Sequence, residues 1–478
     1  MKRIAVIGAG ISGLSAAYAL EKARQSGASL EYVLFESSSR LGGVLVTEHI
    51  QDCLLEAGPD SFLTEKPWAS DLCRELGLQD QLIGSNDHER KTYILCKGRL
   101  VEIPDGLMFM VPTKIVPTLL SSLFSARTKL RMAQEWFHPP HKADGDESVA
   151  SMVERHYGGE MVDRLADPLL SGVYGGNASE LSVRAVLPRF AAMEAQYGSL
   201  GRAMLAARAK MPTSSNSSRP LFTSLKNGMQ QLVDALVSQL QTSALHINRA
   251  VISLQLRNED WIVSSADTSN QFDGIILATP AHVASRLLDP IESRLASELG
   301  AIDYTSSVTI NLGYDERVRS SLPPGFGFLV PRSEGRRMLA ATFVHNKFPH
   351  RAPPDRALLR CFIGGKDNAN TSDLPDEEII RIVRHELQQI VGITAEPLFA
   401  RVYRWNSAMA QYGVGHLERL ERIESLLKEL PGLALAGNGY RGIGVPDCVR
   451  SGSDAAAKIM TVLGLAREQV TPVVAGQT

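Results

Sequence analysis

Residues 4–13 read Ile-Ala-Val-Ile-Gly-Ala-Gly-Ile-Ser-Gly, and this stretch decides the fold around it. Its four apolar residues, followed at once by glycines, are typical of a buried parallel strand that runs into a tight turn. Leu14–Lys22 then has the apolar spacing of a helix, and Tyr32–Phe35 is a second buried strand that ends at Glu36. Strand, glycine turn, helix, strand and terminal acid together predict a βαβ unit that binds a dinucleotide.

Each glycine of the turn has a predicted task. Gly8 permits the tight turn, Gly10 lets the pyrophosphate approach the backbone, and Gly13 lets the helix pack on the strand. The helix start would supply N–H donors to the phosphates, and Glu36 would accept hydrogen bonds from the ribose hydroxyls. The glycines alone would also fit an ordinary helix start, but the two strands and the acid favour a nucleotide site.

Two further segments distinguish FAD from NAD. Arg40-Leu41-Gly42-Gly43 follows Glu36 closely, and Gly58 lies within Leu55–Ser61. Arg40 and the glycine pair resemble the second motif of a superfamily of FAD enzymes that includes amine oxidases, phytoene desaturases and porphyrinogen oxidases. In that superfamily the glycine pair passes the pyrophosphate and the Gly58 segment passes the isoalloxazine ring. The alternative for Arg40 is an ordinary surface salt bridge.

The C-terminal part supplies a third segment. The buried strand predicted at Leu433–Ala436 is followed by a glycine-rich loop, Gly437–Asp447, and then by a helix predicted at Ser453–Leu463. A helix start at this loop would stabilise negative charge on a reduced flavin. Because three segments agree, we predict FAD as the cofactor.

Composition excludes several classes of protein. The 478 residues carry a net charge of −2, which gives no overall attraction to nucleic acid. The five cysteines are widely spaced, which argues against a zinc site and a disulfide framework, so no metal site is expected. The longest apolar segment, Leu107–Phe124, is interrupted by Pro112, Lys114 and Pro117, so we expect no transmembrane helix and a cytoplasmic protein.

Buried strands that meet glycines occur at both ends of the chain, which predicts a discontinuous nucleotide domain. We expect a fold of the α/β and α+β classes: a Rossmann-like FAD/NAD(P)-binding domain, a mixed-sheet substrate domain and a helical insertion. The predicted boundaries are 1–85, 218–283 and 430–470 for the FAD domain, 86–103 and 284–429 for the substrate domain, and 104–212 for the helical domain. The serine-rich segment Thr213–Arg219 is the expected boundary after the helices.

Over nearly its whole length the chain resembles the bacterial porphyrinogen oxidases of haem biosynthesis. Four segments outside the first flavin motifs carry the resemblance: Pro168–Gly176 with Leu181-Ser182, Phe222–Met229, Arg404-Trp405 with Gln411-Tyr412 and Gly415-His416, and Gly444–Cys448. The resemblance implies a six-electron oxidation of a porphyrinogen to a porphyrin. FAD would take hydride equivalents and pass them to O2, which leaves as H2O2.

The resemblance also assigns residues. The Gly172 carbonyl would lie near the reacting methylene bridge, and Phe326 and Leu329 would pack on the macrocycle; the alternatives are a helix C-cap for Gly172 and ordinary strand core for the other two. Flavin contacts would fall on Gly8, Ala9, Gly10, Ile11, Ser12, Gly13, Glu36, Arg40, Gly42, Gly43, Gly58, Val251, Asn438, Ile443, Gly444 and Val445.

The choice between two porphyrinogens depends on a basic pair. Eukaryotic protoporphyrinogen oxidases hold a propionate with an arginine before an aromatic-aliphatic pair, and the matching position here is Thr92. Arg90 and Lys91 stand just upstream, and soluble Firmicute-type enzymes also have a lysine there. We therefore favour coproporphyrinogen III over protoporphyrinogen IX; the alternative for Lys91 is a solvated surface charge.

Two other functions remain open on the sequence alone: a flavin amine oxidase, and a non-catalytic binding protein on the same fold. Leu107–Phe124 is a candidate for weak peripheral contact with a membrane, against the alternative of a pocket wall or core helix. The sequence leaves open whether the chain is a monomer or a homodimer, and whether it has a downstream partner such as a chelatase.

Overall fold

The computed structural model describes residues 1–108, 110–141, 145–209 and 220–465. The predicted boundary segment Thr213–Arg219 lies outside these residues. None of the described helices is long and apolar enough to cross a membrane.

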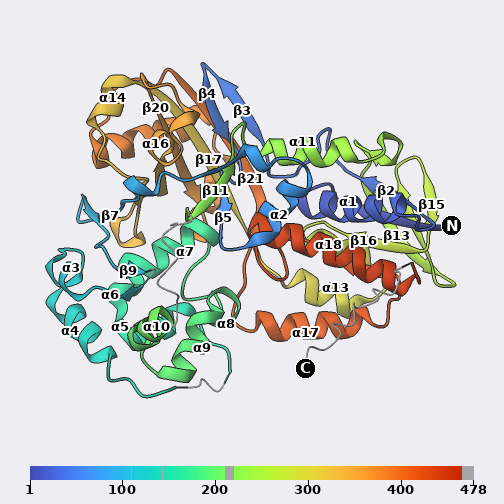
Figure 1. The fold of residues 1–478 in the computed structure, drawn as a ribbon, viewed down its shortest axis with the longest axis horizontal. Helices are drawn as coiled ribbons and strands as arrows, with labels where there is room; N and C mark the ends of the chain where they lie inside the picture. Colours follow the sequence, from blue (N-terminus) through green and yellow to red (C-terminus); the bar gives the residue numbers. More distant parts are fainter. Residues whose placement is uncertain (109, 142–144, 210–219, 466–478) are drawn as a thin grey trace, which may run out of the picture.

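A five-stranded parallel sheet gathers segments from both ends and the middle of the chain (Figure 1). Its strands, in spatial order, are β12 (Leu245–His246), β2 (Leu30–Phe35), β1 (Lys2–Ile7), β16 (Gly274–Leu277) and β22 (Leu433–Leu435). Each neighbouring pair runs parallel. The predicted Rossmann-like fold is confirmed, since three stretches far apart in sequence complete one sheet.

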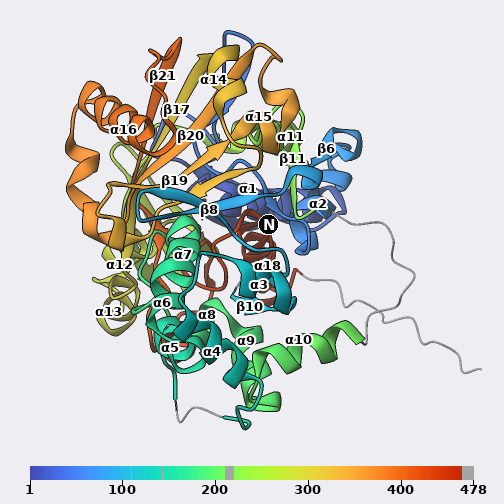
Figure 2. The ribbon, with the colours of Figure 1, turned by 90° about the vertical axis from the view of Figure 1, so that its left-hand side faces the viewer.

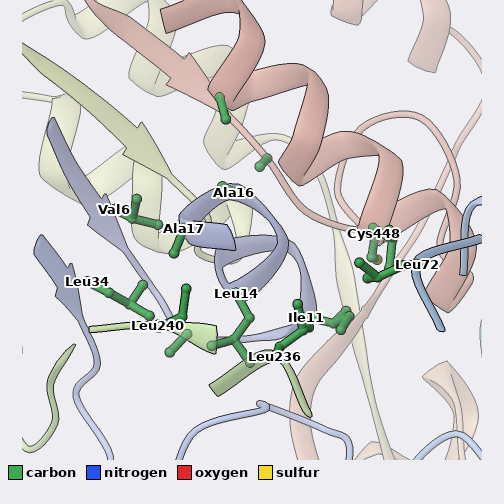
Figure 3. Close-up of a cluster of buried hydrophobic side chains, with 14 of the residues drawn as sticks. Val6, Ile11, Leu14, Ala16, Ala17, Leu34, Leu72, Leu236, Leu240 and Cys448 are labelled. Carbon is green, nitrogen blue, oxygen red and sulfur yellow. The ribbon is translucent and has the colours of Figure 1, made fainter. Parts of the chain in front are cut away.

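Helix α1 (Ile11–Gln25) packs between this sheet, α11 (Gln230–Gln239) and α18 (Val445–Val462). Figure 3 shows Leu14 of α1 next to Leu236 and Leu240. Helix α18 comes so close that a Cβ built on Gly452 would lie 2.0 Å from the carbonyl oxygen of Ser12. The structure also corrects the predicted start of α18, which is Val445 and not Ser453. Pro446 in the first turn fits a helix start.

A second, seven-stranded sheet is mixed, as predicted. Its order is β21 (Phe399–Ala410), β17 (Tyr304–Asp315), β20 (Arg356–Gly364), β19 (Met338–Phe343), β18 (Gly327–Leu329), β7 (Thr92–Cys96) and β8 (Arg99–Glu102). Only β18 and β7 pair in parallel. Apolar side chains of α16 (Asp376–Val391) cover one face of this sheet.

The helical insertion lies beside the opposite face of that sheet (Figure 2). Its helices are α3 (Ile115–Leu120), α4 (Ala126–Glu135), α5 (Val149–Tyr157), α6 (Gly159–Met161), α7 (Asp167–Tyr174), α8 (Val183–Val186), α9 (Pro188–Tyr197) and α10 (Leu200–Ala209). The helical spacing of Val149, Met152, Val153 and His156 predicts an apolar helix face, and this face of α5 is buried. The spacing of Leu119, Leu120, Leu123 and Phe124 predicts a second helix face, and this prediction is wrong, because α3 ends at Leu120. Leu119 and Leu120 are exposed, and only Leu123 and Phe124 are buried.

Smaller elements connect these layers. They are β3 (Thr47–Ile50), β4 (Cys53–Glu56), β5 (Phe62–Leu63), α2 (Pro67–Glu75), β6 (Leu82–Gly84), β9 (Leu107–Met108), β10 (Val111–Pro112), β11 (Phe222–Leu225), β13 (Val251–Arg257), β14 (Asp260–Ser265), β15 (Ser269–Phe272), α12 (Ala281–Leu288), α13 (Ser293–Gly300), α14 (Glu316–Ser321), α15 (Val344–Lys347) and α17 (His416–Leu427). Helices α13 and α17 pack with the five-stranded sheet, although the predicted boundaries place them in the substrate domain.

A buried histidine holds the helical insertion together. The His156 ring lies between two carboxylates, with Nδ1 3.2 Å from Glu135 Oε1 and Nε2 2.9 Å from Glu194 Oε1. Burial lowers the pKa of His156, but the hydrogen bonds and charges of the two glutamates outweigh burial and raise it. The pKa of each glutamate is lowered: burial opposes this, but the hydrogen bond to His156 and other donors prevail.

We predict that His156→Gln destabilises the protein in a pH-dependent way. A raised histidine pKa stabilises the fold below the unfolded value of about 6.5, and this contribution is lost as pH rises through the folded pKa. The substitution should cost about 3 kcal/mol at pH 6, because it leaves the buried Glu135 carboxylate without its cation while Glu194 keeps Arg155, and less at pH 9. Urea unfolding at both pH values measures this, with His88→Gln, an exposed histidine, as control. An equal loss at both pH values would contradict the ion-pair assignment.

Candidate functional site

The glycine turn at the carboxyl end of β1 forms an open cradle. Gly8 has a φ of +100°, and a Cβ there would lie 2.7 Å from the carbonyl oxygen of Ala278. A Cβ on Gly10, in contrast, would meet nothing within 4 Å. Gly10 is also the N-cap of α1 and makes no side-chain hydrogen bond to the first N–H groups of the helix. This arrangement fits a diphosphate group.

The second glycine pair lies against the first. Gly10 and Gly42 form an isolated parallel bridge, and a Cβ on Gly43 would lie 3.1 Å from the Cα of Gly10. Arg40 donates a hydrogen bond from Nη2 to the Gly43 carbonyl. Among the described residues Arg40 has no ion-pair partner, so the salt-bridge alternative is not what the structure shows. Burial lowers the pKa of Arg40.

Glu36 lies at the end of β2, beside the turn. Its Oε2 accepts a hydrogen bond from the Ala9 N–H at 2.9 Å, and its Oε1 accepts one from the Ser38 N–H at 2.8 Å. The carboxylate is thus held at the edge of the cradle. Val251, also predicted to contact the cofactor, is half-buried at the start of β13, two residues after Arg249, whose N–H donates to the Glu36 carbonyl at 2.7 Å.

The Gly58 segment is fixed by side chains of the seven-stranded sheet. Asn311 donates to the carbonyl of residue 56 at 3.0 Å, the Trp405 indole to the carbonyl of Ala57 at 2.8 Å, and Arg360 to the carbonyl of Gly58. A Cβ on Gly58 would lie 1.8 Å from the Val44 carbonyl oxygen, so only glycine fits there. These contacts join the substrate sheet to the nucleotide-binding part.

Five buried charges surround the same segment. Arg351 is 3.2 Å from Glu56, and Lys347 is 2.9 Å from Asp60; Arg360 is 3.8 Å from Asp60. Burial raises the pKa of Glu56 to about 7, against the opposing charge of Arg351. Although burial opposes it, the charges of Lys347 and Arg360 hold the pKa of Asp60 well below its usual range. The sequence analysis missed this cluster, because no motif links its three separate segments.

The C-terminal loop is held by Tyr412. Its hydroxyl donates to the Asn438 carbonyl at 2.7 Å and accepts from the Gly442 N–H at 2.8 Å. Its ring stacks on His416 with the centroids 4.2 Å apart. Ile443 precedes Gly444, which caps α18 without a side-chain hydrogen bond. Val445 and Ile11 pack in one core, so the starts of α18 and α1 lie in the same region.

The predicted substrate residues lie along β18 and α7. A Cβ on Gly172 would be 3.7 Å from Cδ2 of Leu329, so α7 and β18 approach each other here. The C-cap of α7 is Gly175, with φ +62°, and the alternative role for Gly172 is therefore wrong. Phe326 is buried, and its N–H donates to the Lys91 carbonyl at 2.7 Å.

The basic pair Arg90 and Lys91 is exposed at the start of β7. The Lys91 ammonium is 3.2 Å from Glu102, and this contact raises the pKa of Lys91. Its position next to Phe326 brings it to the same edge of the sheet as the other predicted substrate residues.

Comparison with known proteins gives consistent matches. A family described as flavin containing amine oxidoreductase matches residues 11–460. The coproporphyrinogen III oxidase of Bacillus subtilis (strain 168) is 32% identical over 97% of this chain and 98% of its own length. A crystal structure from Exiguobacterium sp. 255-15, assigned as a protoporphyrinogen oxidase, is 30% identical with a TM-score of 0.86, covering 96% of this chain and 99% of that one. The structure of cyclohexylamine oxidase from Brevibacterium oxydans IH-35A matches with a TM-score of 0.68. It covers 97% of this chain and 99% of that chain, at 19% identity.

The flavin-containing family confirms the predicted FAD cofactor and an oxidoreductase. An FAD cofactor fits the structure. The starts of α1 and α18 carry no side-chain cap, and the glycine segments at Gly10 and Gly42 lie against each other. The 19% identity to the amine oxidase shows a shared fold and nothing more.

We predict that Glu36→Ala raises the Kd for FAD about tenfold, because it removes a charged hydrogen-bond acceptor from the edge of the cradle. Titration of the apoprotein with FAD, followed by quenching of flavin fluorescence, measures this. Glu31→Ala, which removes an exposed carboxylate from the same strand, is the matched control and should bind FAD normally. Equal Kd values for the two variants would contradict the role of Glu36.

Proposed function

The chain belongs to the family of flavin-containing amine oxidoreductases, and within it we propose that the chain oxidises a porphyrinogen to a porphyrin in haem biosynthesis. The macrocycle would lose six electrons and six protons in three steps, and each step would reduce one O2 to H2O2. Bound FAD supplies the two-electron chemistry of each step. The named relatives, which match this chain almost end to end, support the proposal.

The single observation that carries the proposal is the approach of α7 to β18 at Gly172 and Leu329. Gly172 lies in the last turn of α7, where backbone carbonyls have no partner within the helix. Its carbonyl is therefore suited to accept a hydrogen bond from a macrocycle held against Leu329 and Phe326. These residues bind and orient the substrate, exclude water and leave the redox step to the cofactor.

The proposed FAD contacts lie in and around the glycine cradle. FAD would place its diphosphate against Gly8–Gly13 and Gly42–Gly43, its ribose at Glu36, and its ring along Gly58 and the Asn438–Val445 loop. The open space at Gly10 and the uncapped starts of α1 and α18 support this placement.

An aerobic assay of both porphyrinogens tests the function. Porphyrin fluorescence should rise while peroxide accumulates at three molecules per porphyrin. Anaerobic mixing separates the amine oxidase alternative: the porphyrinogen, and not a set of common amines, should bleach the flavin absorbance. Bleaching by amines alone would overturn the proposal.

We favour coproporphyrinogen III as the substrate, because its four propionates need more cations than the two of protoporphyrinogen IX. The exposed pair Arg90 and Lys91 at the Phe326 edge supports this choice.

Lys91→Ala should raise KM for coproporphyrinogen III more than for protoporphyrinogen IX, by about threefold to tenfold, because an exposed charge pair contributes about 1 kcal/mol. Steady-state assays on both substrates measure this. Arg99→Ala removes an exposed charge from the neighbouring strand β8 and is the control. Equal effects on both substrates would count against Lys91 as a propionate partner.

We further propose a cytoplasmic protein that touches a membrane surface through α3 and α4. Three large apolar residues of this region are exposed to solvent: the exposed fraction is 65% for Val116, 81% for Leu120 and 85% for Phe137. Lys114, Arg127, Lys129 and Arg131 lie among them, and no acid occurs between residues 106 and 134. Apolar side chains ringed by cations are typical of contact with anionic lipid.

Flotation with vesicles that contain anionic lipid should therefore carry the protein upward. The double variant Leu120→Ser, Phe137→Ser should lose most of this binding, while Val462→Ser, at an exposed apolar position on α18, should keep it. A wild-type protein that does not float with these vesicles would overturn the membrane proposal.

A further inference from the structure

A cationic cavity lies beside α7. Its volume is about 140 Å³, and its lining includes Ser171, Gly175, Arg332, Arg336 and Lys366. One water takes about 30 Å³ of liquid, so the cavity holds a carboxylate arm with a few waters and excludes a macrocycle.

Two of the three cations already face carboxylates. Arg332 Nε is 2.8 Å from Asp167, and Lys366 Nζ is 2.8 Å from Glu180. Arg336 differs, because its Nη1 donates to the neutral amide of Gln389 and its buried Nε has no hydrogen-bond partner. Three cations against two carboxylates leave one excess positive charge at Arg336.

A nearby acid does not cancel this charge. The Glu386 carboxylate accepts hydrogen bonds from the N–H groups of Arg337 and Met338, both at 2.9 Å, and forms no ion pair with Arg336 in the described part of the chain. A buried guanidinium N–H without an acceptor costs free energy, which an anionic ligand would recover.

The cavity adjoins the proposed substrate site. Ser171 precedes Gly172 on α7, and Val330, which also lines the cavity, follows Leu329. The cavity lining therefore includes the sequence neighbour of each residue at the point where Gly172 of α7 approaches Leu329 of β18. A macrocycle against Leu329 thus has a carboxylate site within reach of a side arm.

We propose that this cavity holds a carboxylate arm of the macrocycle, with Arg336 as its partner. The inference rests on the proposed function and assigns to that site a second set of propionate contacts, separate from Arg90 and Lys91. Arg336 would act as a specificity residue that favours substrates with more carboxylate arms.

The test compares Arg336→Gln with Arg337→Gln, which changes the next, exposed arginine. Arg336→Gln should raise KM for coproporphyrinogen III and Kd for coproporphyrin III about tenfold, because a charged hydrogen bond is lost. The effect on protoporphyrinogen IX should be smaller, and kcat and FAD content should stay close to wild type. Porphyrin fluorescence titration gives Kd independently of turnover.

The outcomes separate the two proposals. An active wild type with equal KM and Kd in the two variants would overturn the role of the cavity and leave the function standing. A wild type that neither oxidises a porphyrinogen nor binds coproporphyrin would overturn both. If sodium propionate or phosphate raises the melting temperature of the wild type but not of Arg336→Gln, while KM is equal, the cavity holds a free anion and the arm proposal falls.

Discussion

The structure depends on how the Gly58 segment is held. Three side chains of the seven-stranded sheet, Asn311, Arg360 and Trp405, donate hydrogen bonds to three successive carbonyls of residues 56–58. The segment is thus a strand-like connection between two sheets that share no ladder. Because its carbonyls are buried, each needs a partner, and the sheets cannot slide past each other without breaking these bonds. This constraint fixes the Gly58 segment relative to the seven-stranded sheet.

Positive and negative charges around the Gly58 segment are unequal in number. Lys347, Arg351 and Arg360 outnumber Glu56 and Asp60, and all five are buried among each other. Charges in this environment interact more strongly than in water. Burial raises the pKa of Glu56 to about 7, against the opposing charge of Arg351. The cluster therefore gives the Gly58 segment a positive electrostatic environment.

The features that could be predicted from the sequence are those that depend on residues close together in the chain. The strands around Gly8–Gly13 and the uncapped helix starts follow from nearby residues, and they identify the cofactor. The start of α18 was misplaced because Gly444 resembles a loop, although Pro446 is a usual first-turn residue. The charge cluster around Asp60 and the cavity at Arg336 were not predictable, because they join segments hundreds of residues apart. Leu119 and Leu120 have helical spacing with Leu123 and Phe124 but are exposed, because spacing alone does not show where a helix ends.

The cofactor cradle and the proposed substrate site are built differently, and this difference explains why sequence motifs identify a flavin more readily than a substrate. The cradle is built inside one sheet layer, from glycines whose conformation admits few substitutes. The proposed substrate site is instead an interface, where Leu329 of the mixed sheet packs against the apolar cluster of the helical insertion. Interfaces tolerate side-chain exchange as long as packing is kept. Cyclohexylamine oxidase, at 19% identity, shares this fold with a TM-score of 0.68, and a shared fold does not imply a shared function.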